Sequence, residues 1–213
     1  MKTITIVRHG KAMTGATDEQ SYDNLSEIGQ LQAENVGSYL KATGKYQRVI
    51  SGTMNRHRQT VEHANMGLPH TQDARLNEIP FFELGRALIE DKGFSFPNDD
   101  KAFEPFFTAM LTHWPALAVP RGILLRDQIM HGLLEVLRSL EEDTLVVSSG
   151  GIIGLLGAYA LDLSPAATAK FVIPVAHTSI HRFSLSGDRL FVTKYCSIPH
   201  LDRADQRDLV TFA

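Results

Sequence analysis

The 213 residues of the chain are enough for one large domain, or for a core domain that carries an insertion. Hydrophobic residues make up 43% and charged residues 21%, so the chain can bury a substantial core. A formal net charge of −3 lacks the basic excess that binds nucleic acids and anionic membranes, so we expect neither as a partner.

Cysteine content and hydropathy set further limits. Cys196 is the only cysteine, which excludes an intramolecular disulfide and a zinc cluster built on cysteines. No apolar run approaches the roughly 18 residues that cross a bilayer. The first residues also lack the basic and apolar regions of a secretory signal. We therefore expect a cytoplasmic protein without a membrane segment.

The first predicted element is a short buried strand over residues 4–7, and a basic pair follows it. In open α/β sheets, ligands bind at the carboxyl ends of strands. Arg8 suits two phosphate oxygens there, and His9 suits attack on phosphorus or donation of a hydrogen bond. Gly10 would let the backbone approach a ligand. The alternative is that this tripeptide only ends a strand and faces water.

Strands and helices alternate in the next stretch. A loop over residues 10–25 leads to a helix with Ser26 as its N-cap and Gly44 near its end. Residues 48–51 predict a second short strand, and residues 55–65 predict a second helix. This alternation favours a sheet with parallel strands.

Residues 86–122 interrupt the regularity. The segment carries four prolines and is rich in aromatic residues: Phe94, Phe96, Phe103, Phe106, Phe107 and Trp114. We interpret it as a helical cap inserted over the sheet, within a single domain of residues 1–213; an ordinary helical connection is the alternative. The aromatic side chains would fill the core of the cap or contact an apolar part of a ligand.

The last third of the chain returns to the alternating pattern. A long amphipathic helix is predicted over residues 127–140 and a buried strand over residues 144–148. A tight turn at Gly150 and Gly151 then leads to an apolar helix over residues 152–163. The pattern thus continues the α/β alternation of the first half.

The predicted chain ends in a β-hairpin. Residues 178–185 and 189–196 have strand patterns, and Ser186-Gly187-Asp188 between them is a strong turn signal. Together with the preceding alternation, the hairpin predicts an α/β fold. We expect a three-layer α/β/α sandwich with a mostly parallel sheet, a C-terminal hairpin and the inserted helical cap.

Four segments in order along the chain resemble motifs of the histidine phosphatase superfamily, the phosphoglycerate-mutase-like group. Residues 7–10 match its signature, and residues 25–33 resemble its L-S/T-x-x-G-x-x-Q-A helix start. Residues 51–60 resemble its S-P-L-x-R-A-x-Q-T segment, with Gly52-Thr53-Met54 replacing the usual small-Pro-Leu. Residues 75–78 resemble the stretch that carries its acidic proton donor. Unrelated chains rarely hold four such segments in order.

The resemblance implies a role for each residue of the motifs. His9 would be the nucleophile, forming a phosphohistidine that water or an acceptor discharges. Arg8 and Arg56 would hold the non-bridging oxygens, and Glu78 would protonate the leaving oxygen and then deprotonate water. No metal or other cofactor is required. The alternatives are that Arg56 is a solvated helix charge and that Glu78, with Glu83 five residues on, is a surface carboxylate.

Position 149 departs from the family pattern, which places a second histidine before Gly-Gly to hydrogen-bond the phosphoryl group. Ser149 stands there in this chain, and its neutral hydroxyl cannot supply the charge of an imidazolium. The loss of a charge-assisted donor typically costs about 10²–10³ in rate, roughly 3–4 kcal/mol. Three explanations are open: a natural pseudoenzyme, compensation by another group, or a serine introduced into a once-active enzyme.

His177 is our candidate for compensation, because it precedes the predicted hairpin where the family often carries a polar residue near the site. We hypothesise that its imidazole reaches the phosphate; the alternative is a loop histidine without a role. Six other histidines lack motif context, and we expect them at the surface or satisfied in the core: His57, His63, His113, His131, His181 and His200.

The predicted function is hydrolysis of a small phosphomonoester without a metal, through a phosphohistidine on His9 and with a rate impaired by Ser149. The alternatives are a catalytically weak or inactive protein that binds a phosphorylated ligand for regulation, and a protein-interaction module built around the cap. A phosphoglycerate-type mutase is less favoured, because it must retain its intermediate. The sequence identifies neither the substrate nor the oligomeric state.

Overall fold

We analysed the chain in a computed structural model that describes residues 2–13, 22–97, 100–118, 126–141 and 143–212. The middle of the predicted loop over residues 10–25 lies outside the described residues. So do two short stretches of the predicted cap over residues 86–122. The remaining predicted elements can all be compared with the structure.

The described residues form one sheet of six strands in the order β3-β2-β4-β1-β5-β6. The strands are β1 (Lys2–Arg8), β2 (Arg48–Ser51), β3 (His70–Gln72), β4 (Thr144–Ser148), β5 (Ile180–Ser186) and β6 (Arg189–Ser197). The first four run parallel, while β5 pairs antiparallel with both β1 and β6. The predicted mostly parallel sheet with a C-terminal hairpin is confirmed.

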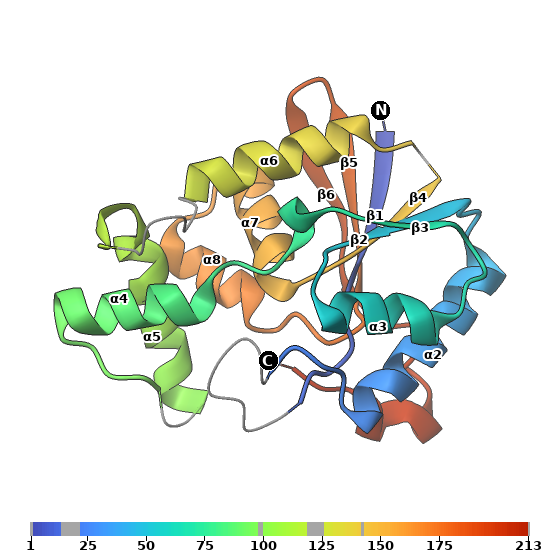
Figure 1. The fold of residues 1–213 in the computed structure, drawn as a ribbon, viewed down its shortest axis with the longest axis horizontal. Helices are drawn as coiled ribbons and strands as arrows, with labels where there is room; N and C mark the ends of the chain where they lie inside the picture. The colour runs from blue at the N-terminus through green and yellow to red at the C-terminus, as the bar shows by residue number, and fades with distance from the viewer. Residues whose placement is uncertain (1, 14–21, 98–99, 119–125, 142, 213) are drawn as a thin grey trace.

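Helices cover both faces of this sheet (Figure 1). They are α2 (Glu27–Thr43) and α3 (Asn55–Ala64) on one face, and α6 (Arg126–Ser139) and α7 (Gly150–Leu161) on the other. Side chains of β1 alternate between the two layers, as the pleat of a strand requires. Val7 packs with Val36 of α2, whereas Ile6 belongs to the cluster that includes Leu133 of α6 and Ile153 of α7. The sandwich is thus held by two separate apolar cores.

A further group of helices lies beside the sheet (Figure 1). It comprises α4 (Phe81–Lys92), α5 (Asp100–His113) and α8 (Pro165–Val172), and α5 packs against α8. The first of these helices begins at Phe81, before the predicted boundary at residue 86. Phe106, Phe107 and Trp114 are buried, so part of the aromatic content of this segment fills its own core.

Two elements of the structure were absent from the sequence-based prediction, β3 and α8. All three residues of β3 are exposed, and the strand lies at the edge of the sheet beside β2, so it carries no apolar pattern. Short 3-10 turns complete the described chain: η1 (Ala74–Leu76), η2 (Trp114–Ala116) and η3 (Ala204–Leu209). None of the helices described is both long and apolar enough to cross a membrane.

The register of the parallel strands brings three chain segments together at one edge of the sheet. Arg8 at the end of β1 is opposite Ser148 at the end of β4, and Ser51 at the end of β2 is opposite Val147. The residues that follow these strands therefore emerge side by side. This is the edge at which open α/β sheets bind ligands.

Candidate active site

His9 is the first residue after β1, and its geometry leaves one ring nitrogen bare. Its backbone N–H donates to the carbonyl of Ser148 at 2.9 Å, which fixes the residue against β4. Its Nδ1 lies 2.7 Å from the carbonyl oxygen of Gly10. Because a carbonyl oxygen only accepts, Nδ1 carries the proton and Nε2 keeps its lone pair. The His9 side chain therefore presents the nitrogen that a nucleophile needs.

The surroundings of His9 keep its imidazole neutral. The residue is 1% exposed. Burial lowers the pKa of His9 well below its ordinary value, and the positive charges of Arg56 and Arg8 lower it further. A neutral imidazole with a bare nitrogen is the reactive form in attack on phosphorus.

Gly10 is a glycine because helix α2 passes too close for a side chain. A Cβ at this position would lie 2.4 Å from the carbonyl oxygen of Gly29. The backbone N–H of Gly10 donates to Thr60 Oγ1 of α3 at 3.0 Å. The residue thus joins β1 to both helices of one layer. This packing accounts for the glycine, while contact of its backbone with a ligand stays a prediction.

Two arginine side chains are buried beside His9. The Arg8 guanidinium donates to the carbonyl of Val175, and its Nε is buried without a hydrogen-bond partner among the described residues. Arg56 is 0% exposed, and its Nη1 donates to Asp23 Oδ1 at 3.0 Å. Burial lowers the pKa of Arg8, an effect that outweighs the opposing contributions of Tyr22 and Glu78. Two buried cations close together form a strong site for an anion. The surface alternative for Arg56 is wrong.

Glu78 lies at the same site as the two arginines, and two backbone N–H groups hold its carboxylate. Its Oε1 accepts from the N–H of Ile79 at 2.9 Å, and its Oε2 accepts from the N–H of Gly151 at 3.4 Å. The preceding segment is tied to the end of β4, because Ser148 Oγ donates to the carbonyl of Leu76 at 2.7 Å. Glu83, the other carboxylate considered, lies on α4 and pairs instead with Arg86.

The second residue of the Gly-Gly pair, Gly151, is a glycine because the carboxylate of Glu78 lies against it. A Cβ at position 151 would lie 2.3 Å from Glu78 Oε1 and 2.9 Å from the side chain of Ile79. The carboxylate therefore occupies space that any other residue would fill. Glu78 and the first turn of α7 are fitted to each other.

Ser149, just before α7, is paired with a histidine that the sequence analysis placed outside the site. The Ser149 side chain is fully buried and does not cap α7. Its Oγ lies 2.6 Å from Nε2 of His57 on α3, and the His57 ring centroid lies 5.5 Å from that of His9. Burial, followed by the charge of Arg56, lowers the pKa of His57 well below its ordinary value. The Nδ1 of His57 is buried without a hydrogen-bond partner among the described residues.

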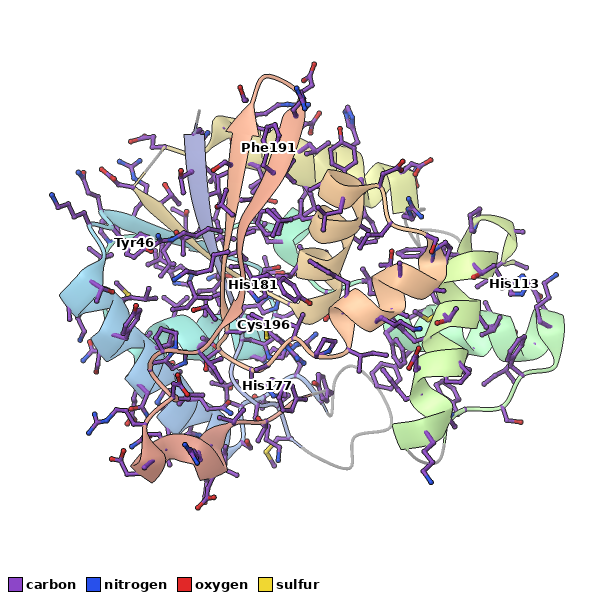
Figure 2. All side chains as sticks on the ribbon, turned by 180° about the vertical axis from the view of Figure 1, so that it is seen from behind. Tyr46, His113, His177, His181, Phe191 and Cys196 are labelled. Carbon is purple, nitrogen blue, oxygen red and sulfur yellow. The ribbon has the colours of Figure 1, made fainter. Side chains whose placement is uncertain are left out.

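His177 also lies next to His9, with ring centroids 5.8 Å apart. Figure 2 shows it at the centre of the molecule, below His181 and Cys196. Its Nδ1 lies 2.9 Å from Oγ1 and 3.2 Å from the carbonyl of Thr211, so Nδ1 carries the proton. Burial and the charge of Arg8 lower its pKa well below the ordinary value. In this neutral form Nε2 is an acceptor, and it can donate to a phosphate only after taking up a proton.

A cavity of about 230 Å³ opens beside these groups. Arg8, Arg56 and Glu78 line its polar end, with Tyr22 stacked under the Arg56 guanidinium. The rest of its wall is apolar and comes from Ile79, Phe81, Phe82, Phe103, Phe107, Val172 and Ile173. His9 lies next to this polar end without lining the cavity itself.

The family model of the histidine phosphatase superfamily (branch 1) matches residues 4–197, most of the chain. The chain belongs to this superfamily. No curated protein matches it significantly. The motifs from which the sequence analysis inferred the resemblance all lie within the matched range.

Solved structures of two phosphatases and of a third protein share the fold of this chain. A mycobacterial glucosyl-3-phosphoglycerate phosphatase in complex with VO3 has a TM-score of 0.63 at 20% identity, covering 92% of this chain and 100% of its own. A mutant phosphoserine phosphatase from Entamoeba histolytica in complex with phosphoserine has a TM-score of 0.64 at 20% identity, covering 94% and 100%. Bacillus stearothermophilus YhfR has a TM-score of 0.65 at 23% identity, covering 94% and 99%. At these identities the likeness shows the fold alone.

Four further histidines of the chain are not among the residues that line the cavity. His63 is half-buried and His131 is exposed, each near a glutamate, while His181 and His200 are buried and bonded to Ser179 and Thr178 respectively. Over the described residues, no group of three or more His, Cys, Asp or Glu side chains is placed to hold a metal ion. The sequence analysis did not place His57 in the site, where the structure puts it next to His9.

Proposed function

We propose that this chain is a phosphomonoesterase that works through a phosphohistidine on His9. The observation that carries the proposal is a neutral, buried imidazole with a bare Nε2, next to two buried arginines and a carboxylate. The arginines would hold the non-bridging oxygens of the phosphoryl group, which is the main protein contribution in phosphoryl transfer. Phosphatases among the structural neighbours support this class of activity.

The reaction would run in two displacements. In the first, Nε2 of His9 bonds to phosphorus while the ester P–O bond breaks, and the Glu78 carboxylic acid gives its proton to the leaving oxygen. In the second, Glu78 takes a proton from a water molecule whose oxygen attacks phosphorus. The P–N bond then breaks, inorganic phosphate leaves, and His9 returns to its starting form. No group other than these side chains and water is needed for the balance.

The alternative to this proposal, a protein that binds a phosphorylated ligand with little or no turnover, depends on Ser149. In the motif pattern it stands where the family has its second histidine, and a serine alone supplies only a neutral donor. A protein that binds a phosphorylated ligand but turns it over slowly or not at all is therefore the second candidate. A mutase is less favoured, because it must retain its intermediate and return the phosphoryl group to it. The role of His177 as a further donor to the phosphate stays a prediction.

We also propose that the alcohol part of the substrate's phosphate ester is apolar. The cavity wall beyond the arginines consists of aromatic and aliphatic side chains, of which Phe81, Phe82 and Phe103 are only partly buried. We take the segment of α4 and α5 to be the cap that holds this group. Burial of an aromatic or aliphatic alcohol against these rings would favour its phosphate ester over that of a small polar alcohol.

A phosphatase assay with an aryl phosphate in the presence of EDTA tests the function. We expect turnover by the wild-type chain, loss of more than 10³-fold in His9→Ala, and no effect of the chelator. Saturable binding of vanadate without turnover would instead support the ligand-binding alternative. Comparison of kcat/KM for 1-naphthyl phosphate and for phosphoserine tests the apolar ester group, which predicts a preference for the naphthyl ester that Phe103→Ala reduces. Equal values for the two substrates would contradict it.

A further inference from the structure

The His57–Ser149 pair is built into the active site by three chain segments. His57 comes from α3, directly after Arg56, and Ser149 comes from the position before α7. Both side chains are fully buried, and their 2.6 Å contact joins helices that lie on opposite faces of the sheet. A buried polar contact of this kind is costly to maintain unless its groups are satisfied or used.

The third segment is Gly52, which leaves room for the ring of His57. A Cβ on Gly52, just after β2, would lie 2.2 Å from Nδ1 and 2.8 Å from Cε1 of His57. The backbone of Gly52 is not in the left-handed region, so the residue is a glycine for room and not for conformation. His57 can therefore enter the site because position 52 has no side chain.

The two residues of the pair are exchanged relative to the motif pattern. The pattern has alanine at the position of His57 and histidine at the position of Ser149. One position carries the imidazole and the other a small residue in either arrangement, and in this chain the imidazole arrives from α3. The centroid of its ring lies 5.5 Å from that of His9, so the pair lies next to the proposed nucleophile.

We propose that His57 is a positioning residue that supplies, through Ser149, the second imidazole of this active site. Nε2–H of His57 donates to Ser149 Oγ, and the Ser149 hydroxyl then directs its own proton to an oxygen of the phosphoryl group on His9. The pair thereby restores a polarised donor at position 149 without a histidine there. This inference rests on the proposed phosphatase function, and it assigns the compensation to His57 in place of His177.

The chemistry of the pair fits this arrangement. A hydroxyl that accepts a hydrogen bond from an imidazole is a better donor to a third group, because the two bonds polarise each other. The neutral state that burial imposes on His57 in the free site changes in favour of the imidazolium when a phosphate dianion enters. In the empty site, burial and then the positive charge of Arg56 lower the pKa of His57, so the imidazole stays neutral there.

An exchange of the two side chains tests the inference. His57→Ala alone should lower kcat for an aryl phosphate by about 10²-fold with little change in KM, because a transition-state donor is weakened. The double variant His57→Ala with Ser149→His should recover at least tenfold over His57→Ala, since it returns the imidazole to position 149. His63→Ala, on the same helix but half-buried beside Glu34, is the matched control and should keep wild-type kcat.

Two results would overturn the inference: wild-type kcat in His57→Ala, or a folded double variant with no more activity than His57→Ala. Thermal unfolding of each variant establishes that it is folded, and His57→Gln provides a second test if His57→Ala is unstable. If the wild-type chain binds vanadate without turnover, the proposed function fails by itself. The vanadate Kd of the same variants then tests the pair, and it should weaken in His57→Ala and recover in the double variant.

Discussion

The Gly151→Ala substitution should separate the acid–base role of Glu78 from the stability of the fold. The added Cβ would lie 2.3 Å from Glu78 Oε1, whereas ordinary contacts begin at 3.4 Å, so the carboxylate must move by about 1 Å. A displacement of that size in a catalytic group can cost about 10²-fold in rate. Alanine is also a better helix former than glycine by about 1 kcal/mol, which offsets part of the packing penalty.

The assay compares substrates with good and poor leaving groups. Departure of 4-nitrophenolate needs little protonation, whereas an alkoxide leaves only with a proton from a general acid. We therefore expect kcat/KM of Gly151→Ala, which reports formation of the phosphohistidine and not its hydrolysis, to fall by about 10²-fold for an alkyl phosphate and much less for 4-nitrophenyl phosphate. Each rate is measured alongside a thermal melt.

Gly157→Ala is the matched control for this experiment. It makes the same substitution in the same helix, and its Cβ would lie 2.1 Å from the ring of Phe171, away from Glu78. It should lower the melting temperature and leave the ratio of the two rates unchanged. An equal loss on both substrates in Gly151→Ala, or no loss on either, would refute the assignment of Glu78 as proton donor.

Three further predictions concern the pH dependence and the packing of the site. Burial lowers the pKa of His200 to about 4, below its ordinary value of about 6.5. Between these values the unfolded chain binds more protons than the folded chain. The free energy of unfolding should therefore fall by about 3 kcal/mol from this residue as the pH drops from 7 to 4. Urea unfolding at several pH values should show a flatter profile in His200→Gln, and an unaltered profile would be inconsistent with this source. Asp23→Ala removes the acceptor of Arg56 and of two backbone N–H groups at the start of α3. We expect KM to rise about tenfold and the free energy of unfolding to fall by about 1 kcal/mol. Unchanged values of both would show that Asp23 holds neither Arg56 nor the start of α3 in place. Gly10→Ala places its Cβ 2.4 Å from the carbonyl oxygen of Gly29 and should lower the free energy of unfolding by about 1–3 kcal/mol, a loss that a denaturant midpoint equal to the wild-type value would disprove.

The fold could be predicted from the sequence where a hydrophobic pattern was strong and local. Strand β4 was predicted at residues 144–148 and occupies Thr144–Ser148, because all five of its residues are buried. Strand β3 was missed because its exposed His-Thr-Gln sequence pairs with β2 only in the folded chain. Helix α8 was also missed, although Ser164 caps it and Pro165 begins it, a local signal that was available.

The candidate site could be predicted as far as its residues follow strands or carry motifs. Arg8 and His9 directly follow a recognisable strand, so their position at the sheet edge was accessible from sequence. His57 was not, because its partner Ser149 lies 92 residues further along the chain and the two meet only through packing of α3 and α7. A local hint was His57 itself, which replaces the alanine of the motif pattern, and the absence of a side chain on Gly52 gives the imidazole its space.

Trapping of the covalent intermediate tests the central claim most directly. The chain is mixed with a ³²P-labelled aryl phosphate and quenched in alkali, in which phosphohistidine survives, and the labelled peptide is then identified. The account predicts label on His9 that forms and decays at rates compatible with turnover, and no label in His9→Ala. Hydrolysis that proceeds without label on His9, or that persists in His9→Ala, would contradict it.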